Sequence, residues 1–182
     1  DKSDFKQINN INFKLIKSLI SIQIEFKVNF KGKTTLFLNN NEVSSEIRNM
    51  KVSRLVSRVA AIPEVRSCLV KEQRRIGLNK GIVMDGRDIG TVVFPNAELK
   101  IFMTASPETR AHRRLEELLV NNKSINYKEV YENITQRDHN DSNRKDSPLV
   151  KASDAYIIDN SNLSKEKQFD LVISWLNKLA ID

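Results

Sequence analysis

The chain has 182 residues and a formal net charge of +7, with 40% hydrophobic and 29% charged residues. This length suits one domain, or one domain with a small satellite, and can bury a hydrophobic core. No apolar run approaches the ~20 residues of a membrane-spanning helix, and no signal-peptide pattern is present. The single cysteine, Cys68, excludes an internal disulfide framework and a cysteine-cluster zinc site, and two histidines make a poor basis for a metal centre.

The positive charge divides into two patterns. The lysines are scattered, whereas the arginines gather after residue 47. The planar guanidinium of arginine suits phosphate recognition better than the point charge of lysine. Aromatic residues, on which a single-strand binder would stack bases, are sparse among these arginines. The composition therefore favours a small phosphorylated ligand over a polynucleotide, with a solvated charged surface as the plain alternative.

The first part of the chain combines helical and strand patterns. Residues 4–20 have apolar side chains at helical spacing, and residues 21–29 then alternate between apolar and polar. Together with an apolar run at 34–38, this alternation predicts an antiparallel hairpin with a polar tip. Residues 46–76 return to helical spacing, and we expect Pro63 to end one helix and open the next.

The second part alternates between strand and helix patterns. Short apolar runs at 81–84, 99–103 and 155–159 predict buried parallel strands. Ser106, which proline follows, predicts the start of a helix, and Ser164 predicts the start of a final helix. Strands that alternate with helices indicate an α/β fold with a parallel sheet.

A charged turn at 85–90 follows the first of these strands. Its sequence is Asp-Gly-Arg-Asp-Ile-Gly. Ligands of open α/β sheets bind at the carboxyl ends of strands. Gly86 would let the backbone approach a ligand, Arg87 can hold a phosphate, and Asp88 can accept hydrogen bonds from a base or sugar. A tight turn whose charges only face water is an equally open interpretation.

Two more basic clusters, at 110–114 and 137–144, flank a helix-like stretch from Tyr127 to Ile134. With a mobile polar segment between them, they would form a lid that closes arginines over transferring phosphates. The alternative is an exposed helical hairpin with solvated charges, which composition alone favours.

Taken together, these segments resemble the bacterial cytidylate kinases, nucleoside monophosphate kinases that act on CMP and dCMP. The resemblance runs from about Val43 to the C-terminus. Its most specific part is Asp-Gly-Arg-Asp followed by Ile-Gly-Thr at 85–91. The hairpin of residues 21–39 is similar to the β insert of the bacterial members.

The resemblance implies a P-loop-kinase-like α/β fold, a parallel sheet with flanking helices. A small antiparallel β insert and a helical lid at about 115–143 would be added to this sheet. Residues 1–80 would form the monophosphate-binding region, and residues 81–182 the remainder of the α/β core.

The resemblance also implies which residues hold the cytidine part of CMP. Ser57, Arg66 and Asp88 would read the cytosine, using polar groups that a wrong base would leave unpaired. Arg137 and Asp141 would hold the ribose or deoxyribose.

Four arginines would serve the phosphates in this resemblance. Arg87 and Arg144 would grip the CMP phosphate, whereas Arg113 and Arg114, at the lid, would meet the phosphates of ATP. The reaction would use ATP and Mg²⁺, and no metal ligand is expected among the side chains of this chain. Phosphoryl transfer suits such a set, because it depends mainly on in-line positioning and on neutralised charge.

One departure from the family pattern is large. Family members begin with a strand and a glycine-rich phosphate loop that ends in Gly-Lys-Ser/Thr, and this sequence contains no such loop. In the family topology, that strand lies between the strands that correspond to 81–85 and 99–104, which would therefore lack a shared neighbour. We expect an N-terminally incomplete form of the enzyme, inactive or nearly inactive alone.

Two other functions stay open on the sequence: a non-catalytic pyrimidine-nucleotide-binding protein and a basic nucleic-acid-binding domain. For the kinase we expect a cytoplasmic monomer whose partners are CMP, dCMP and ATP. No membrane and no specific nucleic acid is expected among its partners.

Overall fold

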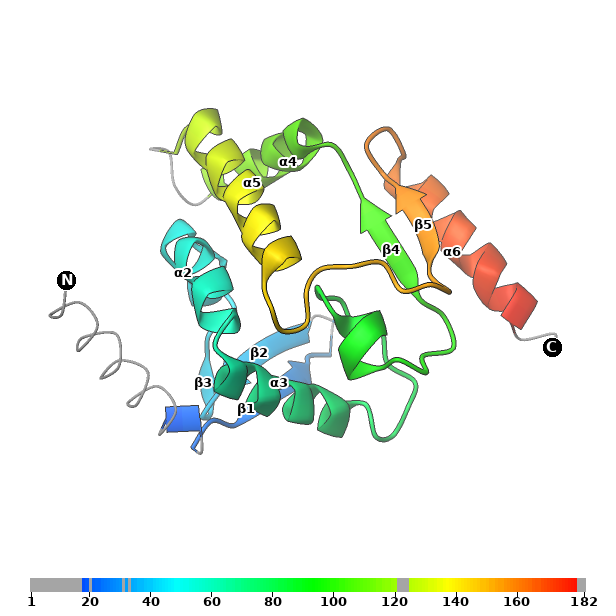
Figure 1. Ribbon diagram of the computed structural model, residues 1–182, viewed down its shortest axis with the longest axis horizontal. Coiled ribbons are helices and arrows are strands. Elements are labelled where there is room, and N and C mark those ends of the chain that lie inside the picture. The colour runs from blue at the N-terminus through cyan, green and yellow to red at the C-terminus, as the bar shows by residue number, and fades with distance from the viewer. Residues whose placement is uncertain (1–17, 20, 31, 33, 121–124, 180–182) are drawn as a thin grey trace, which may run out of the picture. The chain divides into compact units, whose positions relative to one another are not determined.

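The computed structural model describes residues 18–19, 21–30, 32, 34–120 and 125–179 (Figure 1). The chain divides into two compact units, residues 1–79 and residues 80–182. Of the helix predicted over residues 4–20, all but Ser18 and Leu19 lies outside the described residues.

Unit 1 contains a small antiparallel sheet. Its strands are β1 (Ile24–Val28), β2 (Thr34–Leu38) and β3 (Asn41–Glu42). They pair in the order β1-β2-β3. This confirms the predicted hairpin and adds a short third strand, which follows a tight turn where Asn39 and Asn40 take positive φ angles. Asparagine is among the residues that tolerate this left-handed backbone.

The helices of unit 1 begin where capping residues allow. They are η1 (Glu46–Arg48), α2 (Met50–Ala60) and α3 (Pro63–Ile76). The side-chain oxygen of Asn49 accepts a hydrogen bond from the Val52 backbone N–H at 2.9 Å, which satisfies one of the free donors at the start of α2. Pro63 stands at the first position of α3, which confirms the predicted break between two helices.

Unit 2 is built on a parallel strand pair. Strands β4 (Ile101–Thr104) and β5 (Tyr156–Asp159) pair in parallel. The connection between them contains α4 (Pro107–Leu119) and α5 (Tyr127–Asn143), and α6 (Lys165–Leu179) follows β5. Ile158 of β5 is almost fully buried, and the Tyr156 ring stacks on Trp175 of α6 with 4.5 Å between ring centres. The structure is therefore mixed α/β, as predicted, with two of the three predicted parallel strands.

The predicted strand over residues 81–84 is wrong. The segment pairs with no strand in the described part of the chain, and the side chains of Ile82 and Val83 are exposed. Lys80, just before it, and Gly81, its first residue, take positive φ angles, which extended strands do not adopt. An apolar run becomes a strand only when a neighbour accepts its backbone hydrogen bonds, and β4 pairs with β5 alone among the described strands.

No helix in the part of the chain that the structure describes could span a membrane. Each of its helices is too short or too polar to cross a bilayer.

Candidate active site

The carboxylate of Asp141 is the centre of an arginine cluster in unit 2. Asp141 lies in the last turn of α5, and only 3% of its side chain is exposed. Arg87 donates from Nε to its Oδ2 at 3.1 Å, and the Nε of Arg137 lies 3.6 Å from the same oxygen. Arg144 approaches the other oxygen, with 3.6 Å between Nη1 and Oδ1. Three guanidinium groups therefore surround one carboxylate, and the cluster keeps a surplus of positive charge.

Local structure explains why these arginines meet. Arg137 lies one helical turn before Asp141 on α5, at the i,i+4 spacing that places two side chains on one face. Arg144 is the C-cap of α5, where the chain turns back, and its Nε donates to the Ser147 carbonyl. The Leu149 backbone N–H then donates to the Asp141 carbonyl at 2.8 Å, which fixes the turn against the helix end.

The surplus charge affects Arg137 directly. Burial lowers the pKa of its guanidinium, and the neighbouring charge of Arg87 lowers this pKa further. Asp141 and Asp138 act in the opposite direction, while Arg114 adds to the repulsion. An anion bound beside these arginines would relieve their mutual repulsion. The electrostatics of the cluster therefore favour a negatively charged ligand.

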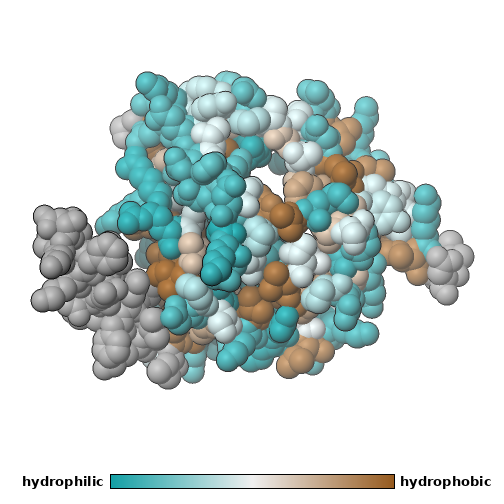
Figure 2. All heavy atoms as spheres, in the orientation of Figure 1, coloured by the Kyte–Doolittle hydropathy of each residue, from teal (hydrophilic) through white to brown (hydrophobic). Residues whose placement is uncertain are grey.

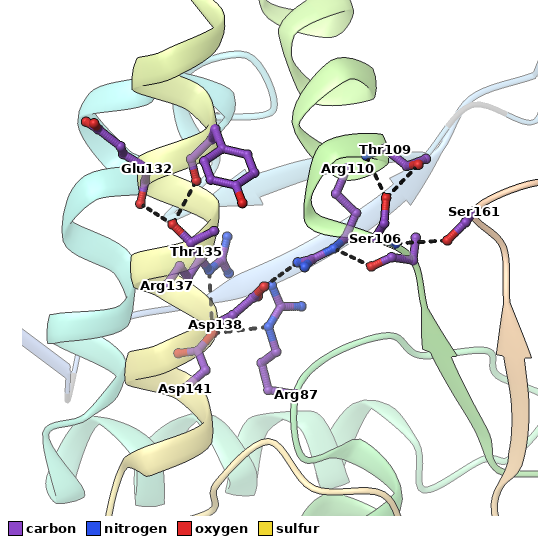
Figure 3. A network of polar contacts seen from close by, with 12 residues as sticks. Arg87, Ser106, Thr109, Arg110, Glu132, Thr135, Arg137, Asp138, Asp141 and Ser161 are labelled. Carbon is purple, nitrogen blue, oxygen red and sulfur yellow. Dashed lines mark hydrogen bonds and ion pairs between the residues drawn. The ribbon is translucent and has the colours of Figure 1, made fainter.

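A second carboxylate lies next to this cluster. Asp138 of α5 accepts a hydrogen bond from Nη1 of Arg110 on α4, and Arg110 also donates from Nε to the Ala105 carbonyl at 3.1 Å. Figure 3 shows the guanidinium groups of Arg87, Arg110 and Arg137 gathered around Asp138 and Asp141. Hydrophilic residues also dominate the surface over α4 and α5 (Figure 2). Arg110 and Asp138 belong to the basic clusters predicted at 110–114 and 137–144, but neither is assigned an individual role from the sequence.

The turn at 85–90 leads from Arg87 into a short π-helical segment, η2 (Ile89–Val93). Asp88 is 4% exposed, and its backbone carbonyl accepts hydrogen bonds from the N–H groups of Val92 and Val93 at 2.8 and 3.2 Å. A side chain on Gly86 would place its Cβ 2.8 Å from Cγ1 of Ile89. A larger residue at this position would therefore force the Ile89 side chain to shift.

The two lid arginines have separate surroundings. Arg113 donates from both terminal nitrogens to Asn160, at 2.9 Å to its side-chain oxygen and 2.8 Å to its carbonyl. Asn160 follows β5, so this contact ties α4 to the end of that strand. Arg114 donates to Glu117 at 2.9 Å on α4, and it lies near enough to the Asp141 cluster to lower the pKa of Arg137. Of the two, Arg114 is therefore the one whose charge affects the Asp141 cluster.

The two predicted base-reading residues outside the turn lie in unit 1. Ser57 is buried on α2, and its hydroxyl has no hydrogen-bond partner among the described residues. Arg66 of α3 donates from Nη1 to the Ala60 carbonyl at 3.3 Å, across the bend between the two helices. The structure thus brings together Arg87, Arg137, Asp141 and Arg144 within unit 2, and it describes Ser57 and Arg66 within unit 1.

The predicted lid falls mainly on α4 and α5. Residues 137–143 of the second basic cluster continue α5 as helix. The mobile polar segment that the sequence predicts at 121–124 lies outside the described residues. Tyr131 of α5 donates to Glu108 of α4 at 3.3 Å, and the rings of His112 and Tyr127 approach to 4.6 Å between centres. These contacts hold the two helices together, while closure of the pair over phosphates stays a prediction.

Comparison with known proteins supports the interpretation that the arginines suggest. Residues 5–178 match the family described as cytidylate kinase. The cytidylate kinase of Flavobacterium psychrophilum is 56% identical over 167 residues, which are 91% of this chain and 74% of that protein. That of Flavobacterium johnsoniae is 55% identical over 91% of this chain and 73% of its own length. That of Cytophaga hutchinsonii is 47% identical over 92% of this chain and 72% of its own length.

These matches confirm the resemblance found in the sequence. They do not test the roles assigned to individual residues, nor the expectation that the 182-residue chain is inactive alone, and both stay predictions. A family match over nearly the whole chain, with relatives more than half identical, leaves one conclusion: the chain belongs to the cytidylate kinase family.

Proposed function

We propose that the chain acts in phosphoryl transfer from ATP to CMP or dCMP, and that the Asp141 cluster holds the phosphate groups of this reaction. The observation that carries the proposal is the convergence of Arg87, Arg137 and Arg144 on one buried carboxylate. Three positive charges against one negative charge leave the cluster suited to a bound anion. Arginine is also the side chain best matched to phosphate geometry.

Arg87 is the best-placed phosphate ligand of the three. Its Nε is occupied by Asp141, and within the described residues neither terminal nitrogen has a hydrogen-bond partner. Its side chain is 38% exposed, so these donors are open to a ligand. We infer that Asp141 fixes the guanidinium through Nε and leaves its outer edge to the CMP phosphate. A direct contact of Asp141 with the ribose stays a prediction.

The chemistry requires little covalent help from the protein. An oxygen of the CMP phosphate attacks the γ-phosphorus of ATP in line, a new P–O bond forms, and the bond to the β–γ bridging oxygen breaks. ADP leaves with the electron pair of that bond, and the acceptor phosphate needs no general base because it is already ionised. The arginines orient the acceptor and neutralise charge on the transferring group.

The residues at this cluster do not fit a protein-held Mg²⁺ ion. Asp138 and Asp141 both direct their carboxylates at arginines. No group of three metal-ligating side chains comes together in the described part of the chain. What the cluster itself supplies is therefore the positive charge and the hydrogen-bond donors of its arginines.

Calorimetry with the 182-residue chain tests the proposed function. We expect CMP and dCMP to bind, with AMP bound at least tenfold more weakly because Ser57, Arg66 and Asp88 read the cytosine. Equal binding of AMP and CMP, or no binding of any nucleotide, would contradict the proposal. A parallel assay of ADP release from ATP and CMP tests the expected inactivity of this chain, and turnover would contradict that expectation alone.

A further inference from the structure

Arg110 and Asp138 form a pair whose members lie in the two predicted lid clusters, where neither residue is assigned a role of its own. The two residues come from different helices, α4 and α5, and are 28 positions apart in the chain. Their side chains are 34% and 30% exposed, so the pair lies at the surface rather than in the core. An ion pair at the surface contributes little to stability, so its effect is more on the position of the side chains that form it.

Arg110 is held at two of its three guanidinium nitrogens. Its Nε donates to the Ala105 carbonyl, and its Nη1 donates to Asp138. Nη2 has no hydrogen-bond partner within the described ranges. Arg87 is also held by a carboxylate of α5, but through Nε, which leaves both of its terminal nitrogens open. In Figure 3 the guanidinium groups of Arg110 and Arg87 point toward Asp138 and Asp141 of α5.

The groups around Asp138 set its environment. Arg110 donates a hydrogen bond to Asp138, and the negative charge of Asp138 raises the pKa of Arg137, its neighbour in the chain. Asp141 lies one turn further along the same face of α5 and holds Arg87. The two carboxylates thus stand one helical turn apart, and each fixes one arginine that comes from another segment.

We propose that Asp138 is a positioning residue that holds Arg110 next to the Asp141 cluster, so that the free Nη2 of Arg110 binds a phosphate group of the reacting nucleotides. This inference rests on the proposed function, because it names a further ligand of the same phosphates. The shared chemistry is a phosphate oxygen, which either the acceptor or the donor nucleotide can supply.

Asp138→Asn separates positioning from simple electrostatics, because the two make opposite predictions. The variant removes one negative charge, so a general field effect would tighten the binding of any anion. Loss of positioning would instead weaken anion binding, because a charged acceptor no longer holds the Arg110 guanidinium. Glu132→Gln is the matched control: it removes the same charge from α5, at a side chain that is 64% exposed.

Calorimetry with inorganic pyrophosphate and with cytidine measures the effect. We expect Asp138→Asn to weaken pyrophosphate binding by about fivefold and Arg110→Gln to weaken it by about tenfold or more, as the loss of a charged hydrogen bond predicts. Cytidine, which has no phosphate, should bind both variants as it binds the wild type. If the variants instead loosened the packing of α4 and α5, cytidine binding would weaken as well. Glu132→Gln should leave pyrophosphate unchanged or slightly tighter.

Wild-type or tighter pyrophosphate binding by Asp138→Asn would overturn the inference. If that variant folds poorly, Arg110→Gln decides, because it keeps Asp138 and a hydrogen bond to it; wild-type affinity there would also overturn the inference. Titrations with CMP and ADP identify the nucleotide that supplies the phosphate, and unchanged affinity for both would contradict the proposal. Failure of the proposed function would show separately, as equal binding of CMP and AMP by the wild type.

Discussion

Replacing Asp141 by asparagine should destabilise unit 2 strongly. Asparagine keeps the size of the side chain and one acceptor oxygen, but it removes the charge and puts an NH2 donor where the second oxygen faced an arginine. Three arginine nitrogens lie 3.1, 3.6 and 3.6 Å from the carboxylate oxygens in the native structure. After the change, these guanidinium groups repel one another with no counter-charge between them.

The distances between the arginine nitrogens and the Asp141 carboxylate set the size of the expected loss of stability. At an effective dielectric constant of about 20, two unit charges at 3.6 Å attract by about 5 kcal/mol before desolvation is counted. Removing one partner of a buried pair has a net cost of about 3–5 kcal/mol. Because Arg87 and Arg137 are each about one-third exposed, water offsets part of this loss. We therefore expect a decrease of about 3 kcal/mol in the free energy of unfolding.

Urea unfolding followed by circular dichroism measures this decrease. Asp170→Asn, a change of the same type at an exposed position on α6, should stay within about 0.5 kcal/mol of the wild type. Pyrophosphate should stabilise Asp141→Asn, because the anion takes over part of the role of the carboxylate. A loss below about 1 kcal/mol would refute the view that Asp141 holds the cluster together.

Three smaller changes test other parts of the molecule. Ser57→Ala removes a buried hydroxyl that has no partner among the described residues. In urea unfolding, the stability of this variant should stay the same or rise by up to about 1 kcal/mol, while its selectivity for CMP over AMP falls. Gly86→Ala should cost about 1–3 kcal/mol, because the added Cβ meets the Ile89 side chain, and the double variant with Ile89→Ala should recover much of that loss. In the wild type, the backbone hydrogen bond at the start of α4 and a hydrogen bond from Tyr131 lower the pKa of Glu108, so Tyr131→Phe should raise that pKa in an NMR titration.

Each of these has a result that counts against it. A clear loss of stability in Ser57→Ala would mean that the hydroxyl has a partner in the folded protein. Additive losses in the Gly86 and Ile89 double variant would remove the steric explanation. For Glu108, the lowered pKa means that its contribution to stability is present above the ordinary glutamate pKa and is lost as the pH falls through the folded value. An unchanged pKa in Tyr131→Phe would show that the hydrogen bond has no effect.

Local signals in the sequence predicted the helices well. Ser106 and Pro107 mark the start of α4, and the Ser106 hydroxyl accepts a hydrogen bond from the Thr109 N–H at 3.1 Å, as a helix cap should. Pro63 marks the boundary between α2 and α3 in the same way. These signals lie within a few residues of the structure that they determine, so they can be read without knowing the fold.

Contacts between distant segments explain what the sequence missed. Residues 81–84 have the composition of a buried strand, but a strand also depends on its neighbours, which composition does not reveal. Arg87 and Asp141 are 54 residues apart, and only their family resemblance placed them at one site. Asp138 could have been found from its position one turn before Asp141, on the same face of the helix that carries Arg137.

The central claim is that the cluster around Asp141 binds a phosphate, and Arg87 tests it most directly. Calorimetry should compare CMP and cytidine on the wild type and on Arg87→Met, which keeps much of the apolar stem but has no guanidinium. We predict that CMP binding weakens about tenfold or more, the cost of a charged hydrogen bond, while cytidine binding is unchanged. Equal affinity of Arg87→Met and the wild type for CMP would contradict the claim.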